Sequence, residues 1–354
     1  MPFTLVYPML ERLTIYFNLT EPGNVLGDWI MLKIFELHAI KKKLIEVEQY
    51  LEQALDFEEP AIRQSALNIL HAGGKRVRPA LTIMTASMFH NEDKIIPLAA
   101  AMEMVHMASL IHDDVVDQAD LRRGQPTMNV QYGDRYALHV GDYILTAAID
   151  IIRQQPHSQR ILKIMGDLSV EMCLGEVEQL RTTFDVEQTV EDYKYRIDRK
   201  TALLMATSCQ AAAVASDASE RDIDIFYKIG YNLGMDFQIG DDILDMEQNS
   251  KKIGKPAGSD LAHGIMTLPT ILVLQQEFAE KEELLRLIRN RFAGGQPEVN
   301  RAISIIIKQG GLEEAAVYRE GYLRQAETYI QQLPEYTLKK VLLDGVDYLR
   351  ERTF

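Results

Sequence analysis

Apolar residues recur at intervals of three and four along most of the chain from Met31 onward, and this spacing predicts amphipathic helices. The clearest predicted helices cover residues 59–70, 77–89, 94–118, 136–154, 159–181, 190–215 and 220–247. Further helices begin near residue 267 and continue to the end of the chain. No window alternates strictly between apolar and polar residues, and the best strand candidate, Ile303–Ile307, is flanked by helical sequence. The pattern therefore predicts an all-α fold, a bundle of paired helices.

The first thirty residues break this pattern. Residues 1–30 contain Pro2, Pro8 and Pro22 and show no clear period. We expect this segment to be a loosely attached N-terminal arm or an upstream extension. Residues 31–354 contain no linker-like, low-complexity or repeated stretch, so we expect them to form a single domain.

Composition excludes several classes of protein. The chain of 354 residues is 47% hydrophobic and 25% charged. This is typical of a globular protein that is large enough for one big core or two domains. Its net charge of -14 and pI near 5.1 argue against nucleic acid and against an anionic membrane surface as partners. No apolar run reaches the ~18 residues of a membrane span, and the start lacks the basic region of a signal peptide. With two cysteines, Cys173 and Cys209, both in apolar helical patterns, we expect buried thiols and a cytoplasmic protein.

Two acidic motifs of the form Asp-Asp-x-x-Asp stand out on apolar helical backgrounds. The first runs from Asp113 to Asp117 and the second from Asp241 to Asp245. Residues four apart share one helix face, and like charges there repel. A single such motif is more often a solvated helix face, but two with apolar flanks favour a shared role. Hard divalent cations such as Mg²⁺ bind one or two carboxylates together with water and phosphate oxygens, so the motifs predict a cradle for Mg²⁺ and a diphosphate.

Basic clusters supply the other half of an anion site. Three cations occur within Gly73–Pro79, at a glycine turn entering a helix, and others lie in 120–124, 199–201 and 254–256. Helix starts attract anions through their N–H groups, and arginine binds phosphate with two hydrogen bonds. Each cluster alone is as readily a solvated turn. Four of them in an acidic protein predict two phosphate-binding regions, one bridged by metal and one held directly by Lys and Arg.

Together, these motifs resemble the trans-isoprenyl diphosphate synthases, or polyprenyl synthetases. The resemblance covers roughly residues 40–350, in matching order and spacing. It rests on Gly-Gly-Lys-Arg-x-Arg-Pro, His-Asp-Asp-Val-Val-Asp, Leu-Arg-Arg-Gly, Arg-Lys-Thr, Phe-Gln-x-x-Asp-Asp-Ile-Leu-Asp, Gly-Lys-Pro and Thr-Leu-Pro. The segments around Met107–Asp114 and Glu171–Gln179 look most like the large catalytic component of two-component bacterial heptaprenyl or hexaprenyl diphosphate synthases. The fold implied is the isoprenoid synthase fold, a helical bundle around a deep central cavity.

The resemblance also implies roles for individual residues. The metal ligands, for about three Mg²⁺, would be Asp113, Asp114, Asp117, Asp241, Asp242 and Asp245. The catalytic group would be Asp113, Asp117, Asp241 and Lys200. The allylic diphosphate would contact Arg122, Lys200, Thr201, Gln238 and Lys255. Isopentenyl diphosphate would contact Lys75, Arg78, His106 and Arg123. His106 taken alone is more typical of a core histidine, and only the resemblance gives it a role.

Product length follows from the side chains before the first motif. The product tail should run along that helix, and the residues one turn (~5.4 Å) before Asp113 are Ala108 and Ser109. Both are small, where short-chain relatives carry an aromatic residue. With Val105, Met102 or a residue from elsewhere as the floor, and about one isoprene unit per turn, we expect products longer than twenty carbons. The resemblance implies a chain of about thirty to thirty-five carbons, with heptaprenyl diphosphate for the menaquinone side chain favoured.

Three alternatives remain open at this point. A terpene cyclase would share the first motif but lack the isopentenyl site, so Lys75 and Arg78 argue against it. A shorter-chain geranylgeranyl-type synthase differs only in cavity length, and a non-catalytic helical subunit would not need intact acids. The two-component resemblance implies a homodimer, or a heterodimer with a small non-catalytic component. Two departures have no explanation in the sequence: Ile265 replaces a lysine usual in the family, and Asp236 is an added acid.

Overall fold

The computed structural model describes residues 38–122, 124–247, 257–334 and 337–351. Apart from one pair of two-residue strands, the regular elements in these ranges are helices, so the predicted all-α fold is confirmed. The chain divides into two compact units, and it passes from one to the other inside α9, inside α11 and directly before α12. The expectations of a single domain and a central cavity stay predictions, and the N-terminal arm lies outside the described ranges.

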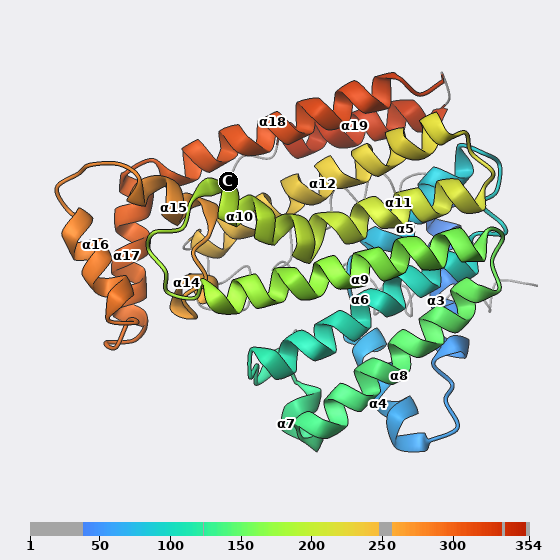
Figure 1. Ribbon diagram of the computed structural model, residues 1–354, viewed down its shortest axis with the longest axis horizontal. Helices are drawn as coiled ribbons and strands as arrows, with labels where there is room; N and C mark the ends of the chain where they lie inside the picture. The colour runs from blue at the N-terminus through green and yellow to red at the C-terminus, as the bar shows by residue number, and fades with distance from the viewer. Residues whose placement is uncertain (1–37, 123, 248–256, 335–336, 352–354) are drawn as a thin grey trace, which may run out of the picture. The chain divides into compact units, whose positions relative to one another are not determined.

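The first unit, which ends at Lys163 and takes in residues 211–219 as well, is built around α6 (Ile96–Val116). Its other elements are α3 (His38–Ala54), α4 (Pro60–His71), α5 (Val77–Ser87), β1 (Leu121–Arg122), β2 (Gln125–Pro126), α7 (Met128–Tyr132), α8 (Asp134–Arg153) and the start of α9 (Ser158–Arg181). Helices α3, α5, α7 and α8 all pack on α6 (Figure 1). Because neighbours cover α6 on several sides, thirteen of its 21 residues are buried, which explains why its sequence is apolar around most of its circumference.

The second unit is built around α12 (Glu220–Met246), which runs beside α18 (Gly311–Gln331) and also contacts η1 (Asp198–Ala202), a π-helical turn (Figure 1). Its remaining elements are α10 (Val190–Ile197), α11 (Leu203–Ala215), α14 (Ser259–Ala262), α15 (Leu268–Leu274), α16 (Lys281–Arg289), α17 (Gln296–Lys308) and α19 (Thr337–Glu351). The two acidic motifs thus belong to different units: the first ends α6 and the second ends α12.

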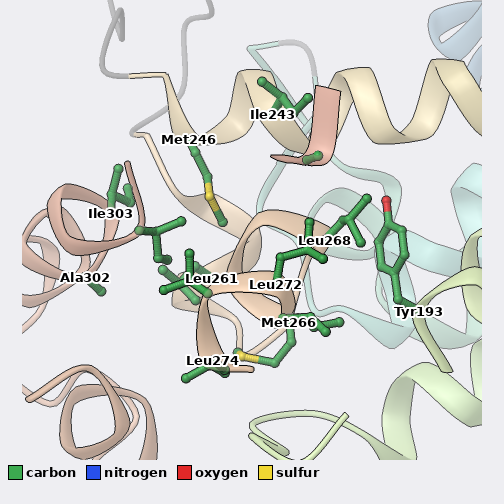
Figure 2. Close-up of a cluster of buried hydrophobic side chains, with 14 of the residues drawn as sticks. Tyr193, Ile243, Met246, Leu261, Met266, Leu268, Leu272, Leu274, Ala302 and Ile303 are labelled. Atoms are coloured by element: carbon green, nitrogen blue, oxygen red, sulfur yellow. The ribbon is translucent and has the colours of Figure 1, made fainter. Parts of the chain in front are cut away.

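One apolar cluster holds the end of α12 in the second unit (Figure 2). Ile243 and Met246 from α12 meet Leu268 and Leu272 from α15, and all four are nearly fully buried. Tyr193 from α10 reaches the same cluster with its ring, while its hydroxyl points away from the apolar side chains (Figure 2). Burial of such side chains contributes roughly 1.5–3 kcal/mol each, so the helix that carries the second motif is firmly fixed.

The structure departs from the sequence-based expectations in three places. The helix predicted over 190–215 is interrupted by the π-helical turn η1. The short strands β1 and β2 were not predicted, whereas Ile303–Ile307, the best strand candidate in the sequence, lies inside α17 as its helical flanks indicated. The expectation that both thiols are buried is wrong for Cys173, which is exposed on α9, and confirmed for Cys209. Cys173 belongs to an apolar face of α9 that is exposed. The apolar helical pattern around Cys173 was therefore read correctly, but it did not indicate a buried side chain.

Candidate active site

The first acidic motif closes the last turn of α6. Asp113 is half-buried and Asp117, which caps the helix, is exposed. The backbone N–H of Asp117 donates to the Asp113 carbonyl at 2.8 Å, so both acids lie on one helical face as predicted. Asp114 turns into the protein and is only 6% exposed. The second acid of the motif is therefore the most deeply buried of the three.

Arg122 is the reason that Asp114 turns inward. Its Nε donates to the two Asp114 carboxylate oxygens at 2.8 and 2.9 Å, and Nη2 lies 2.8 Å from Oδ1. The strands β1 and β2 hold Arg122 in this position, and the Thr127 hydroxyl secures the turn by donating to the Ala119 carbonyl. A half-buried arginine fixed by one face still presents its other N–H groups to an anion. Arg123, the next residue, lies outside the described ranges.

The glycine turn before α5 separates its three cations. Arg76 is 4% exposed and forms a buried ion-pair group with Glu48 and Glu103. Burial would lower the pKa of Arg76, but these two carboxylates raise it overall. Burial is also the main reason that the pKa of Glu48 is raised. Lys75 and Arg78, the two predicted substrate contacts, are half-buried, so the middle cation anchors the turn and its neighbours are left on the accessible side.

Two histidines on α6 have different surroundings. The ring of His112 lies against Gly141 of α8, where an added Cβ would come within 2.5 Å of Nε2, and Nε2 is 3.3 Å from the Asp142 carboxylate. His112 therefore joins α6 to α8. His106, the predicted substrate contact, is half-buried two turns before Asp113, and its carbonyl accepts a hydrogen bond from Ser109 at 2.9 Å.

The second motif ends α12 and divides its three acids in a related way. Asp241 is half-buried. Asp242 is 2% exposed and accepts hydrogen bonds from the Tyr193 hydroxyl at 2.6 Å and from Gln238 Nε2 at 2.9 Å. Asp245 accepts from two backbone N–H groups at the start of α14, at 3.1 and 3.0 Å. Asp242 and Asp245 thus hold the fold together, and Asp241 is less buried than Asp242.

Burial determines the ionisation of Asp242. Loss of water raises its pKa to about 8, and the nearby charge of Asp260 adds to the effect, against the lowering by its hydrogen bonds from Tyr193 and Gln238. Burial likewise raises the pKa of the Tyr193 hydroxyl. Such a carboxyl group is an internal hydrogen-bond acceptor. The predicted metal-ligand role is therefore better supported for Asp241 than for Asp242, just as it is for Asp113 over Asp114.

The π-helical turn η1 carries the predicted Lys200 and Thr201. Lys200 Nζ lies 2.8 Å from the Glu176 carboxylate and donates to Gln179 Oε1 at 3.3 Å, both from α9. The Thr201 hydroxyl donates to Gln238 Oε1 at 2.6 Å. Single π turns inside α-helices are frequent at functional sites because they redirect side chains. Here the turn directs a cation and a hydroxyl toward separate, fixed partners.

A glycine in α12 allows η1 to approach this closely. A Cβ added to Gly234 would lie 2.6 Å from the Cα of Ala202 and 3.3 Å from its carbonyl. Gly234 is one turn before Gln238, which in turn is one turn before Asp242. The close approach therefore places Thr201 within hydrogen-bonding distance of Gln238. Lys255, predicted to contact the same substrate, lies outside the described ranges.

Both departures noted in the sequence have a place in the second unit. Asp236 is buried in α12 and pairs with Arg319 of α18, whose Nε donates to Oδ1 at 2.8 Å and whose Nη2 donates to Oδ2 at 3.3 Å. The extra acid is thus one side of a buried ion pair between two helices. Ile265 is half-buried beside Gly264, whose carbonyl accepts from the backbone of Phe184 at 2.8 Å.

The donor set fits an open magnesium site. Within the described ranges, no three or more acidic, histidine or cysteine side chains come together as a closed metal-binding group. Magnesium does not require such a cage, because it usually keeps water and takes one or two carboxylates with substrate phosphate oxygens. Asp113 and Asp117 in the first unit, and separately Asp241 in the second, are half-buried or exposed carboxylates of this kind.

Comparisons with known proteins agree with these features. The polyprenyl synthetase family matches residues 59–306. A relative from Bacillus subtilis, heptaprenyl diphosphate synthase component 2, is 38% identical, and the alignment covers 87% of each chain. The chain belongs to the polyprenyl synthetase family. It is therefore a prenyltransferase that makes a polyprenyl diphosphate.

Solved structures of polyprenyl synthetases have the same fold. The heptaprenyl diphosphate synthase of Staphylococcus aureus matches with a TM-score of 0.81 and 32% identity, over 88% of this chain and 98% of that one. A polyprenyl synthase of Caulobacter crescentus, solved with calcium and isoprenyl diphosphate, matches with a TM-score of 0.84 and 28% identity, over 94% and 99% of the two chains. The expected resemblance to this family is thus confirmed.

Sequence reasoning missed four residues that shape this polyprenyl synthetase site. Tyr193, Glu176 and Gln179 contact predicted residues, and Arg319 pairs with the added acid Asp236; none of the four carries a motif of its own. Glu176 and Gln179 lie three residues apart on α9, in a segment that supported the resemblance. Residues at this spacing share one helix face, and this was the only sequence signal that both could contact the same neighbour. Tyr193 and Arg319 are 49 and 83 residues from their acidic partners, and no local pattern reveals contacts over that separation.

Proposed function

We propose that the chain is a magnesium-dependent trans-prenyltransferase that condenses an allylic diphosphate, farnesyl diphosphate or longer, with successive isopentenyl diphosphates. The favoured product is heptaprenyl diphosphate, destined for the menaquinone side chain, and the favoured location is the cytoplasm. The observation that carries the proposal is the difference in burial within both motifs: Asp114 and Asp242 are buried against Arg122 and Tyr193, whereas Asp113, Asp117 and Asp241 are half-buried or exposed. None of the helices in the described ranges is both long and apolar enough to cross a membrane.

The chemistry follows from the charges that these residues supply. Asp113, Asp117 and Asp241 would hold about three magnesium ions with the allylic diphosphate, and bound magnesium neutralises the charge that grows on the leaving diphosphate. Arg122, Lys200 and Gln238 would contact the same diphosphate. Its C–O bond ionises to an allylic cation and diphosphate. The double bond of isopentenyl diphosphate attacks the cation, and the departing diphosphate takes the proton that is lost, giving a trans product five carbons longer.

A direct assay tests this proposal. The full chain is incubated with farnesyl diphosphate, labelled isopentenyl diphosphate and Mg²⁺, with and without a candidate small component, and the products are separated by chromatography. Label in a heptaprenyl product supports the proposal. A product of twenty carbons would instead support a geranylgeranyl-type synthase, and no product with any partner would support a non-catalytic subunit.

Product length is expected to depend on Ala108. Val105 and Ala108 are 5% and 2% exposed on α6, and Ser109 is half-buried beside them. Ala108→Phe fills the space one turn before Asp113, so we expect chromatography to show products shorter by one or more isoprene units. Ala108→Ser keeps the side chain small and should leave the length unchanged. If Ala108→Phe melts at the wild-type temperature and still makes the full-length product, the tail does not run along α6.

An exposed apolar face on α9 supports a partner subunit. Val170, Leu174, Val177 and Leu180 are 59%, 45%, 61% and 57% exposed, and with Ser169 and Cys173 most of them line one apolar hollow. Their spacing of three and four residues makes a continuous helical stripe, and exposed apolar patches mark interaction sites. The Bacillus subtilis relative is named component 2 of its synthase. We therefore propose a small non-catalytic component as the occupant, with a second copy of this chain as the other outcome.

The stripe is tested by placing a charge in it. We expect Val177→Asp to abolish association with the partner in size-exclusion chromatography with light scattering, because the charge would be buried without a counter-ion. Val317→Asp is a matched control, since Val317 is 69% exposed on α18 of the same unit and should change nothing. Equal association of both variants would rule out the α9 stripe as the interface.

A further inference from the structure

Tyr193 is a buried residue whose hydroxyl the proposed chemistry does not use directly. The side chain is 1% exposed and its ring packs in the apolar cluster of the second unit (Figure 2). A buried tyrosine hydroxyl requires a hydrogen-bond partner, and here it donates to Asp242 Oδ2 at 2.6 Å. Asp242 directly follows Asp241 in the second acidic motif, so Tyr193 connects the core with the site.

From Asp242 the hydrogen bonds continue to two predicted substrate contacts. Gln238 Nε2 donates to the other carboxylate oxygen, Oδ1, at 2.9 Å. The Thr201 hydroxyl donates to Gln238 Oε1 at 2.6 Å. Three successive hydrogen bonds therefore link Tyr193 in α10 with Thr201 in η1 through two residues of α12. We call these four residues the Tyr193 network.

The chemistry of the groups fixes the direction of each bond. Gln238 Nε2 faces Asp242 Oδ1 and Gln238 Oε1 faces the Thr201 hydroxyl, so the NH₂ end of the carboxamide donates and its carbonyl end accepts. One N–H of the carboxamide is used by Asp242. The second N–H is thereby oriented, and it is a suitable donor to an anionic oxygen. With the network broken, the carboxamide rotates between two orientations and this donor loses its fixed direction.

The Tyr193 ring is itself held by neighbours that do not belong to the network. The Arg196 guanidinium lies 5.6 Å from the ring centroid, and it donates to Gln188 Oε1 at 2.8 Å and to the Met266 carbonyl at 2.5 Å. Because Arg196 is 3% exposed, the ring has one packed position. The hydroxyl is therefore a fixed point from which the rest of the network is oriented.

We propose that Tyr193 is a positioning residue for prenyl transfer: through Asp242 it orients the Gln238 carboxamide so that its second N–H donates to the allylic diphosphate. The inference rests on the proposed function, since it takes the allylic diphosphate as the ligand of Gln238. It assigns Asp242 to the network and leaves magnesium to Asp113, Asp117 and Asp241. Tyr193 touches no reacting atom and acts only through its neighbours.

Tyr193→Phe tests this role in the full chain with its partner present. Losing one oriented hydrogen bond to a charged group is worth about tenfold in affinity, so KM for the allylic diphosphate should rise about tenfold. KM for isopentenyl diphosphate and the Mg²⁺ concentration for half-maximal activity should stay within about twofold. Tyr227→Phe, on α12 outside the network, should change none of these values. A purely structural role would lower the active fraction and kcat without changing either KM, and that result would overturn the proposal.

A double-mutant cycle shows whether Tyr193 acts through Gln238. In a Gln238→Ala background, the carboxamide is absent, so adding Tyr193→Phe should change KM for the allylic diphosphate by less than about twofold. If Tyr193→Phe still raises KM about tenfold in that background, the two residues act independently and the proposal fails.

A second variant covers the case in which Tyr193→Phe does not fold. Tyr193→Phe combined with Asp242→Leu removes both partners of the buried bond, and such apolar pairs are often tolerated. The proposal expects the same rise in KM for the allylic diphosphate and an unchanged magnesium requirement. A wild-type KM, or a raised magnesium requirement that identifies Asp242 as a ligand, would overturn it. Loss of activity in the wild-type protein would instead refute the proposed function.

Discussion

Asp113→Ala and Asp241→Ala are each expected to lower the rate of prenyl transfer by about 10²–10³-fold, because in the proposed function each removes a carboxylate that would hold magnesium against the leaving diphosphate. Neither acid is fully buried, so the melting temperature should change little. Steady-state assays with saturating substrates, repeated over a range of Mg²⁺ concentrations, measure the effect. The loss should persist at high Mg²⁺, since the ligand itself is absent.

Exposed acids near each motif provide matched controls for these variants. Asp120 follows the first motif and is exposed, and Asp224 is exposed on α12 beside Lys228. Asp120→Ala removes an exposed acid close to the first motif, and Asp224→Ala removes one from the first turns of α12, the helix that ends with the second motif. Both should leave activity within about twofold, as exposed pairs contribute little. If Asp113→Ala or Asp241→Ala retained near-normal activity, the magnesium-ligand assignment would be refuted.

Arg319→Ala is expected to destabilise the protein by about 3–5 kcal/mol, because it leaves Asp236 as an unpaired buried charge. The two side chains are 5% and 1% exposed. Their pairing joins α12 to α18, and Asp236 is five residues before Asp241. Urea denaturation measures the change. The double variant Asp236→Leu with Arg319→Met should recover most of the lost stability, since apolar residues of similar volume often replace a buried ion pair.

An exposed ion pair on the same helix serves as the control. Arg324 is 74% exposed and pairs with Glu320 one turn away, so Arg324→Ala should lose less than about 1 kcal/mol. Equal losses of unfolding free energy in Arg319→Ala and Arg324→Ala would show that the buried Asp236 needs its partner no more than the less buried Glu320 does.

The comparison between the two motifs shows where sequence reasoning reached its limit. The spacing of Asp113 and Asp117 placed them on one helical face, and the structure confirms it. The resemblance to the family implied all three acids of each motif as metal ligands, with Asp113, Asp117 and Asp241 as the main ones. In the structure, Asp114 accepts a hydrogen bond from Arg122, and Asp242 accepts one from Tyr193. Neighbouring acids in one motif look alike in sequence, and their roles differ because helical rotation turns the second one toward the interior.

The break in the helix predicted over 190–215 has a tertiary cause. The residues of η1 have ordinary helical character, and nothing in their sequence demands a π turn. Gly234 allows the α12 backbone to approach Ala202, and Thr201 bonds to Gln238 across that approach. A pattern within one helix carries no information on how closely a second helix packs, so the sequence predicted the helix but not its interruption.

By itself, the sequence determined the all-α class, the limits of most helices and the family, because apolar periodicity and motif spacing are local properties of the chain. Only the tertiary structure decided that Asp114 and Asp242 are the most buried carboxylates of their motifs. It also decided that Arg76 is buried as the anchor of the glycine turn while Lys75 and Arg78 are half-buried, and that the apolar face of α9 with Cys173 is exposed. These outcomes depend on partners tens of residues away along the chain, as with Arg76 and Glu48. They are fixed only when packing removes water from one side of a helix and leaves the other side exposed.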